Sequence, residues 1–280
     1  MRRVLAGWVT VMLAASACAA HSAPIADVLR AASADQDACR NAKDRVAAIQ
    51  ACTRLISPSP TDPGVAADAY IRRAELLGPS NSDEAIGDLT TALKLNPKAA
   101  SALRLRARLY AMKNNLDAAM ADLNQVIAVS PIDADGYVER AALRQRLGDT
   151  SGAAADYTEA LRLRPNNADY YGLRGGADLK IRNYDSAVAD LNQAVRLAPQ
   201  SAKLVTLHGE VADAMHDQVG ALVDFDKAIA LDPKLPSPYV GRASVEFRER
   251  DYTGAVNDLD IGLALVQCSH AARLRAPGAR

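Results

Sequence analysis

The side chains that could carry out chemistry are few, and their spacing matches no common catalytic or metal-binding pattern. The four histidines are His21, His208, His216 and His270. No two of them have the HExxH spacing of a zinc site, and no Cys–His or Ser–His–Asp set can be assembled from the local motifs. The sequence therefore predicts no enzyme activity, no bound metal and no cofactor. The alternative, from a different functional class, is an enzyme whose active site is concealed by the rest of the chain.

Two short motifs suggest ligand binding, but each has a simpler structural explanation. Asp133-x-Asp135-Gly136 begins like a calcium loop, yet Tyr137 occupies the third ligand position. We interpret this motif as a turn that caps a helix. The glycine-rich segment 172–176 lies inside a helical pattern and not after a strand, so it does not predict a phosphate-binding loop.

Residues 1–23 have the features of a cleaved secretory signal peptide. Arg2 and Arg3 precede an apolar run from Leu5 to Ala17 that is too short to span a bilayer comfortably, and small residues follow it. An uncleaved membrane anchor is the alternative. Cleavage leaves 31 basic and 33 acidic residues, a net charge of −2, and no other apolar stretch of membrane-spanning length. This charge argues against a nucleic-acid partner.

The four cysteines are interpreted in the context of export. Cys39 and Cys52 are 13 residues apart, a pair that predicts a disulfide in an exported chain. Cys268 is then left over, either as a free thiol or as a partner for Cys18. The segment that ends at Cys18 (ASAC) is similar to a bacterial lipobox, although alanine stands where that motif usually has leucine. A lipid on Cys18 would anchor the chain to a membrane.

An internal repeat of 34 residues determines the elements that position these side chains. Prolines recur at this interval, at 97, 131, 165, 199 and 233. The segment before each proline has one design, such as AVADLNQAVRLAP, in which an invariant alanine is followed four residues later by a large residue. That spacing marks one face of a helix, which the proline ends. A sixth copy has Gln267 in place of the proline.

Another helix is predicted before each of these, with an alanine or glycine four residues after an apolar or aromatic one. Such a helix–turn–helix unit, repeated every 34 residues, resembles the tetratricopeptide repeat. The resemblance implies an all-α fold, an α-solenoid of antiparallel helix pairs forming a right-handed superhelix. The 57 alanines agree with it, because alanine favours helices and lets them pack closely.

The repeats divide the chain into four parts. Residues 1–23 are the signal peptide, 24–64 a degenerate N-terminal repeat with the disulfide, 65–269 six tetratricopeptide repeats, and 270–280 a C-terminal tail. In the degenerate repeat, Cys39 falls in the first helix and Cys52 in the second, on faces that are expected to meet. The disulfide would then stabilise the end of the solenoid, where a repeat has only one neighbour. The stretch ACRNAKDRVAAIQACTRLI resembles the start of many exported bacterial tetratricopeptide proteins.

A pair of charged positions accompanies every repeat. The basic residue that precedes the small residue of the first helix is Arg73, Arg106, Arg140, Arg174, His208 or Arg242. The acidic residue that precedes the large residue of the second helix is Asp88, Asp122, Asp156, Asp190, Asp224 or Asp258. A ladder of charges that binds a ligand is one interpretation. We favour the other, a pair inside each repeat that fixes how its two helices dock, because the pair recurs with the repeat.

The resemblance places the binding surface on the concave face lined by the first helices. The residues expected to form a groove for a partner are Arg104, Arg108, Arg146, Gly172, Gly176, Lys180 and Phe247. Arg104 and Arg108 are four residues apart, so both are expected to point the same way and hold a carboxylate. A solvated charged face is the alternative. Glycine inside a helix lowers its stability, so the presence of both Gly172 and Gly176 suggests that a partner approaches the backbone closely there. Sequence drift explains the two glycines equally well.

These features together predict a non-catalytic scaffold that binds a peptide or helix of a partner protein in the concave groove. The carboxylate clamp of chaperone-binding family members is not expected, because Glu139 stands where that clamp has asparagine and Asp169 where it has lysine. We expect the protein in the Gram-negative periplasm. The alternative is an outer-membrane lipoprotein adaptor, anchored through Cys18, that recruits envelope enzymes or assembly factors.

Overall fold

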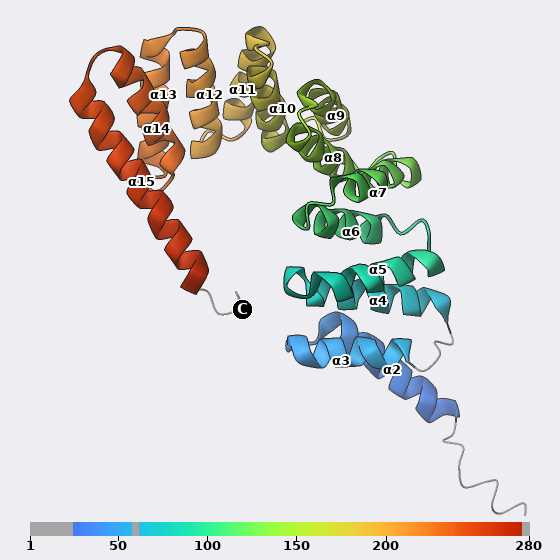
Figure 1. The fold of residues 1–280 in the computed structure, drawn as a ribbon. Helices are drawn as coiled ribbons and strands as arrows, with labels where there is room; N and C mark the ends of the chain where they lie inside the picture. Colours follow the sequence, from blue (N-terminus) through green and yellow to red (C-terminus); the bar gives the residue numbers. More distant parts are fainter. Residues whose placement is uncertain (1–24, 58–61, 276–280) are drawn as a thin grey trace, which may run out of the picture. The chain divides into compact units, whose positions relative to one another are not determined.

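The computed structural model describes residues 25–57 and 62–275, and every regular element in these ranges is a helix (Figure 1). The all-α prediction is therefore confirmed. The predicted signal peptide, and with it Cys18, lies outside the described residues.

Helices pair in chain order, and each pair corresponds to one repeat. The first helices are α2 (Ile25–Asn41), α4 (Pro63–Leu77), α6 (Ala100–Met112), α8 (Ala134–Arg146), α10 (Ala168–Lys180), α12 (Ala202–Ala214) and α14 (Pro236–Arg248). The second helices are α3 (Arg45–Ile56), α5 (Ser82–Leu95), α7 (Leu116–Val129), α9 (Thr150–Leu163), α11 (Tyr184–Leu197), α13 (Gln218–Leu231) and α15 (Tyr252–Arg275). A 3-10 turn, η1 (Pro79–Asn81), joins α4 to α5.

The chain divides into two compact units, residues 1–97 and residues 98–280. In the first unit, the α2–α3 and α4–α5 pairs stack through contacts between α3 and α4. In the second unit, the five pairs from α6–α7 to α14–α15 stack in the same way, each second helix contacting the next first helix. This is the predicted solenoid of helix pairs. The first of the six predicted repeats, α4–α5, belongs to the same unit as the degenerate repeat.

The turns inside the pairs of the second unit share one backbone geometry. Each has a residue with positive φ at the same repeat position: Asn114, Gly148, Arg182, His216 and Arg250, with φ between 59° and 85°. This left-handed residue ends the first helix. The following residue is Asn or Asp, and in four of the five turns its side chain accepts a hydrogen bond from the backbone of the next helix. The turn therefore holds the two helices antiparallel.

Two predicted boundaries differ from the structure. The helix of the first full repeat begins at Pro63 and not at residue 65, because Asp62 caps it and proline is favourable at the first helical position. The predicted tail from residue 270 is helical as far as Arg275, as a continuation of α15. No proline interrupts this helix, since Gln267 occupies the proline position of the repeat.

The N-terminal pair contains the predicted disulfide. Cys39 of α2 and Cys52 of α3 are bonded, with their Cα atoms 4.8 Å apart, and both are buried. Alanine 51 and Ala69 pack around them, so the disulfide belongs to the small core that α2 and α3 share with α4. Cys268 is a free, exposed thiol on α15.

The small residues of the repeat allow close contact between paired helices. At Gly175 of α10, an added Cβ would lie 2.9 Å from Cγ of Leu191 on α11, closer than real side chains approach. The equivalent Ala107, Ala141 and Ala243 are buried in the same kind of contact. The helix pairs are therefore held by thin aliphatic cores, which explains the alanine-rich composition.

The charged pairs of the repeat form inside each helix pair, as we favoured. In five copies an arginine donates two hydrogen bonds, from Nε and Nη2, to the two oxygens of its aspartate, at 2.6–2.9 Å. In the sixth, His208 Nδ1 lies 2.5 Å from Asp224 Oδ2. Each of the five arginines also stacks 5.8–6.0 Å from a tyrosine ring of its own helix.

The same basic residues connect neighbouring pairs. Arg174 Nη1 donates to Thr158 of α9, which is the second helix of the preceding pair, at 3.1 Å, and Arg140 does the same to Asn124 of α7 at 2.9 Å. Arg73 and Arg242 make the equivalent bonds, to Thr53 of α3 and Asp226 of α13. These four arginines thus bind three helices: their own, the second helix of their pair and the second helix of the pair before. These arginine side chains use their hydrogen bonds to hold helices together, so we do not expect them to bind a ligand.

Candidate functional site

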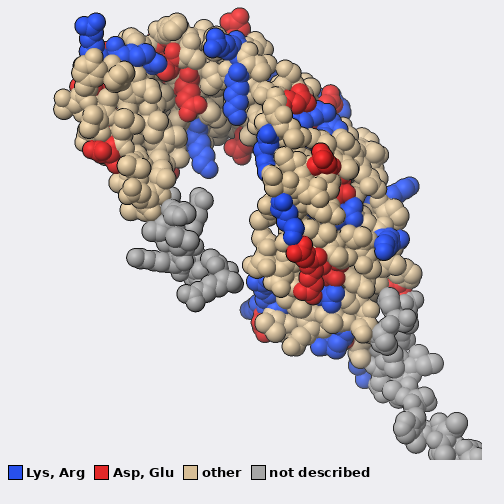
Figure 2. All heavy atoms as spheres, in the orientation of Figure 1, with Lys and Arg blue, Asp and Glu red and all other residues tan. Residues whose placement is uncertain are grey.

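The first helices of the second unit lie on the inner side of its curve. Successive first helices contact one another directly, α10 with α12 and α12 with α14, and the pairs of this unit follow a curve (Figure 1). Several basic side chains face this inner side (Figure 2). The concave face predicted from the family resemblance is therefore present within this unit.

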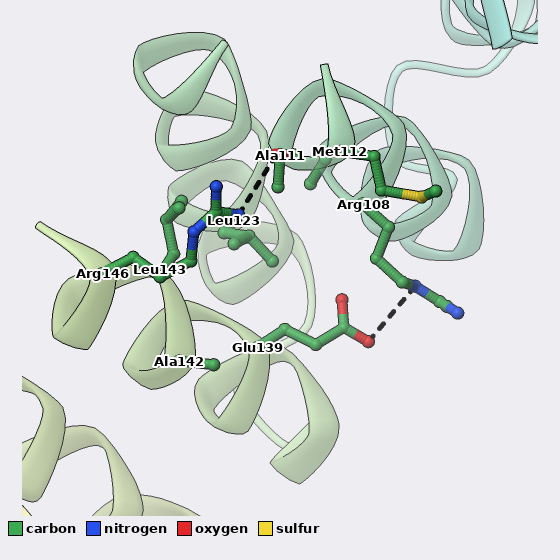
Figure 3. A pocket seen from close by; sticks show the side chains of 9 residues that line it. Arg108, Ala111, Met112, Leu123, Glu139, Ala142, Leu143 and Arg146 are labelled. Atoms are coloured by element: carbon green, nitrogen blue, oxygen red, sulfur yellow. Dashed lines mark hydrogen bonds and ion pairs between the residues drawn. The ribbon is translucent and has the colours of Figure 1, made fainter. Parts of the chain in front are cut away.

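A pocket of about 330 Å³ opens between α6 and α8, with α7 behind it (Figure 3). We call it the α6–α8 pocket, and its lining residues are Ala107, Arg108, Ala111, Met112, Leu123, Glu139, Ala142, Leu143 and Arg146. Alanines 111 and 142 come from facing positions of consecutive first helices, and their small side chains leave the space open. The base is aliphatic, and the charged residues that line the pocket are Arg108, Glu139 and Arg146.

Glu139 supplies the polar group of this pocket. Its Oε1 accepts hydrogen bonds from Nε and Nη2 of Arg104 at 3.1 and 2.8 Å, and Arg108 Nε lies 3.6 Å from the same oxygen. The other oxygen, Oε2, is buried and receives no hydrogen bond from any described residue. Figure 3 shows this carboxylate directed into the space between α6 and α8. Glu139 therefore keeps one buried oxygen without a hydrogen bond, beside the aliphatic base of the pocket.

Arg104 does not have the predicted role. We expected Arg104 and Arg108 to hold the carboxylate of a ligand, but the carboxylate between them is that of Glu139. Arg104 Nη1 also donates to both oxygens of Asp133 at 3.3 Å, so all three nitrogens of its guanidinium donate to carboxylates of the chain. Arg108 is the exposed cation of the two, with 57% of its side chain accessible.

A polar network continues from Arg104 to the next helix pair. Asp133 is the N-cap of α8 and accepts from the backbone N–H groups of Asp135 and Gly136, which confirms that the calcium-like motif is a helix cap. Asp135 accepts from the hydroxyl of Tyr170 at 2.7 Å and from Arg164 at 2.9 Å. The Tyr170 hydrogen bond, followed by the Arg164 contact, lowers the pKa of Asp135. These bonds fix α6, α8 and α10 relative to one another.

Arg146 closes one side of the α6–α8 pocket. Its Nη1 donates to the carbonyl oxygen of Ala111 at 3.1 Å (Figure 3). Its Nη2 lies 3.4 Å from Oδ1 of Asn114. Arg146 is exposed, so its guanidinium remains accessible at the pocket edge. Arg108 and Arg146 are thus two predicted groove residues that the structure brings to one site, together with Glu139.

The other predicted groove residues do not line this pocket. Gly176 and Lys180 lie on α10, where Lys180 is exposed, and Phe247 lies on α14, exposed and edge-on to Tyr252 at 5.4 Å. Gly172 is buried, and a Cβ added there would collide with Cδ2 of Leu204 on α12. Its glycine thus has a packing reason within the chain, in place of the partner contact that we suggested from the sequence.

A second hollow, of about 570 Å³, lies between α12 and α14. Its apolar wall is formed by Phe225, Leu235 and Val240, and its polar side by Glu210 together with two serines. Burial raises the pKa of Glu210, for which no hydrogen bond is found among the described residues. The inner face therefore has a basic-edged pocket at one end of the unit and an acidic hollow at the other.

The arrangement of charged residues around an aliphatic base is suited to binding. Among the described residues, no group of histidine, cysteine, aspartate and glutamate side chains has the geometry to hold a metal ion. None of the described helices combines the length and hydropathy needed to cross a bilayer. The exposed cations can orient a ligand, and the aliphatic base can bury one of its side chains.

The pocket itself was not predicted from the sequence. Its base, formed by Ala111, Leu123, Ala142 and Leu143, has the apolar residues of an ordinary repeat core. The available signal was the pair of alanines at facing positions of adjacent copies, where a large residue would have filled the space. Glu139 was noted only as a departure from the chaperone-binding clamp.

Comparisons with known proteins agree with this fold. A sequence model described as tetratricopeptide repeat matches residues 75–136 and 138–202. A tetratricopeptide repeat protein from Parabacteroides merdae has 17% identity and a TM-score of 0.68, over 84% of this chain and 93% of that one. YrrB, described as a TPR protein with an unusual peptide-binding site, has 22% identity and a TM-score of 0.56, over 66% of this chain and 94% of its own.

The protein pilF of Pseudomonas aeruginosa is also similar, with 24% identity and a TM-score of 0.53, over 60% of this chain and 77% of that one. At these identities the structural likeness concerns the fold alone. No curated protein sequence matches the chain.

Proposed function

Because the chain belongs to the tetratricopeptide repeat family, we propose that it is a non-catalytic scaffold that binds a peptide segment of a partner protein on the inner face of its second unit. The observation that carries this proposal is the α6–α8 pocket, which has an aliphatic base and an exposed cation within one surface. Peptide binding by YrrB supports the proposal, since that protein has the same fold.

The pocket chemistry specifies the kind of segment that it fits. An aliphatic side chain of the ligand would occupy the space between Ala111 and Ala142, where burial of one such side chain contributes about 1.5–3 kcal/mol. An acidic group of the ligand would face Arg108, whose side chain is more than half exposed. The preferred ligand is therefore an aliphatic residue next to an acidic one.

The test is a peptide selection followed by affinity measurements on matched variants. Residues 24–280, with the disulfide formed, select peptides from a phage-displayed random library, and fluorescence anisotropy then measures their affinity. Ala142→Leu fills the pocket and is expected to weaken binding about tenfold or more. Ala121→Leu makes the same change at an exposed alanine of α7 and is expected to leave affinity unchanged. Equal affinity of the two variants would refute the proposed site.

We further propose that the protein works in the cell envelope of a Gram-negative bacterium, in the periplasm. The signal-like residues 1–23 and the Cys39–Cys52 disulfide support this location, because stable disulfides form in oxidising compartments. Anchoring through Cys18, as in an outer-membrane adaptor, is the alternative. Labelling of cells with radioactive palmitate separates the two: incorporation that is lost in Cys18→Ser supports the anchor, and absence of incorporation supports the free periplasmic form.

A further inference from the structure

The hollow between α12 and α14 is the repeat equivalent of the α6–α8 pocket, and we call it the α12–α14 hollow. Five of the residues that line it are Glu210, Asp213, Phe225, Gly241 and Ser244. Each of them follows a lining residue of the α6–α8 pocket by three 34-residue repeats; those residues are Arg108, Ala111, Leu123, Glu139 and Ala142 respectively. The two cavities therefore occupy the same structural position in different copies of the repeat.

The charge at this position is inverted between the two cavities. On the earlier of the two first helices, Glu210 stands where the α6–α8 pocket has Arg108. On the later one, Gly241 stands where that pocket has Glu139. A ligand group that is attracted to one cavity is therefore repelled by the other.

Glu210 is the carboxylate of the hollow that lacks a partner. Asp213, the other acidic residue in the lining, accepts a hydrogen bond from Arg248. No hydrogen bond or ion pair to Glu210 is found among the described residues, and its side chain is partly buried. Burial raises the pKa of Glu210, and a cation from a ligand would oppose this effect.

The hollow is open because of a glycine on α14. In the preceding copy, Leu207 stands at the position of Gly241, and its Cδ2 would lie 3.9 Å from a Cβ added to Gly176 on α10. That leucine therefore occupies the equivalent space between α10 and α12. At Gly241 no side chain fits, since an added Cβ would lie 2.5 Å from the ring of Phe225.

The wall of the hollow suits a long side chain with a charged end. Phe225, Leu235 and Val240 form an apolar surface within a volume of about 570 Å³. Lysine and arginine can lay their aliphatic stems along such a surface while the charged group reaches an anion. An acidic side chain would be repelled by Glu210, and an aliphatic one would leave this carboxylate desolvated and unpaired.

We propose that the α12–α14 hollow binds a lysine or arginine side chain of a partner peptide, with the charged group on Glu210 and the stem against the apolar wall. The inference rests on the proposed function in one respect, namely that the ligand of the inner face is a peptide. The inner face then selects for opposite charges at two equivalent positions of the repeat.

Peptide selection with the α6–α8 pocket filled tests the proposal. Residues 24–280 with Ala142→Leu select peptides from a phage-displayed random library, and we expect lysine and arginine to be enriched among them. Glu210→Gln in the same background should weaken their binding about tenfold or more in fluorescence anisotropy, because a charge-assisted hydrogen bond is lost. Norleucine in place of the enriched basic residue should weaken binding to a similar degree, with little further loss in Glu210→Gln.

Glu249→Gln is the matched control. Glu249 is an exposed residue at the end of α14 that does not line the hollow, so this variant should keep the affinity of its parent. Ser244→Leu fills the hollow from an exposed position, as Ala142→Leu fills the pocket. It should also weaken binding about tenfold or more, which provides a second test if Glu210→Gln does not give a folded circular dichroism spectrum.

The outcomes separate this proposal from the proposed function. Selected peptides without basic residues, or equal affinities for Glu210→Gln and Glu249→Gln, would overturn the hollow as a site for a basic side chain. If the parent chain selects peptides and the Ala142→Leu chain selects none, the hollow is refuted and the proposed function stands. If neither chain selects a peptide, both are refuted.

Discussion

Substitution of Asp190 tests the claim that the repeated charged pairs hold the helix pairs together. Asp190 is buried on α11, and its two oxygens accept hydrogen bonds from Nε and Nη2 of Arg174 at 2.6 and 2.7 Å. The Arg174 side chain is 24% exposed and stacks on the ring of Tyr171. Asp190→Ala would leave this guanidinium largely buried without its anion, while its bond to Thr158 remains.

The expected cost follows from this burial. Breaking a buried ion pair by removing one partner costs about 3–5 kcal/mol, because the remaining charge is desolvated and unpaired. The accessible quarter of Arg174 relieves part of that penalty, so we expect about 3 kcal/mol. Asp190→Asn keeps one acceptor and loses the charge, and it should cost about half as much.

Urea denaturation followed by circular dichroism measures these changes in the free energy of unfolding. Asp185→Ala is the control: it removes an exposed aspartate from the first turn of the same helix, where the helix dipole makes it worth about 0.3–1 kcal/mol. Affinity for a selected peptide, per folded molecule, should be unchanged in Asp190→Ala. If this variant has the urea midpoint of the parent but has lost peptide binding, the charged pairs serve a ligand and our reasoning is wrong.

Three further predictions concern other parts of the chain. The hydrogen bond to its aspartate raises the pKa of His208 above 6.5, so its stabilising contribution is complete below pH 6.5 and is lost as the pH rises through the raised value. The urea midpoint should fall between pH 6 and pH 9, and His208→Arg should abolish that fall. Gly172→Leu should cost about 1–3 kcal/mol by overpacking against α12, whereas Gly176→Ala should stabilise by up to about 1 kcal/mol, both measured by urea denaturation. Cys39→Ser with Cys52→Ser should destabilise the first unit by about 3 kcal/mol, seen as faster hydrogen exchange in α2 and α3 with α8 to α14 unchanged.

The fold could be predicted from the sequence, because the residues that determine it lie close together in the chain and recur in every repeat. The 34-residue interval of the prolines, the invariant alanines and the recurring arginine–aspartate spacing each specify the same helix pair. Agreement between six copies removes the ambiguity that one copy would have. The disulfide followed from the same register, which placed Cys39 and Cys52 on facing helices.

The candidate site was harder to predict from the sequence, because it depends on contacts between neighbouring repeats. The partners of Arg104 are Asp133 and Glu139, which lie 29 and 35 residues away on the next pair. The i, i+4 rule compares positions on one helix, so it related Arg104 to Arg108 and missed the carboxylate between them. In the same way, Gly172 was judged from its own helix, although its environment is set by Leu204 of α12.

The length of α15 illustrates a different limit. The missing proline at Gln267 was visible, but an absent stop signal does not tell where a helix ends. Leu259 and Leu263 of this helix are 49% and 57% exposed, because no further helix pair follows α15 among the described residues. An apolar face in the sequence does not by itself reveal whether another helix covers it.

Site-specific photo-crosslinking in living cells tests the central claim, that the α6–α8 pocket holds the partner. A photoreactive benzoylphenylalanine replaces Met112, which is 63% exposed at the pocket edge, or Val219, which is 73% exposed on α13. We predict a discrete adduct with a partner protein from position 112, lost when Ala142→Leu is added, and no such adduct from position 219. The same adduct from position 219, or a position-112 adduct that survives Ala142→Leu, would contradict the account.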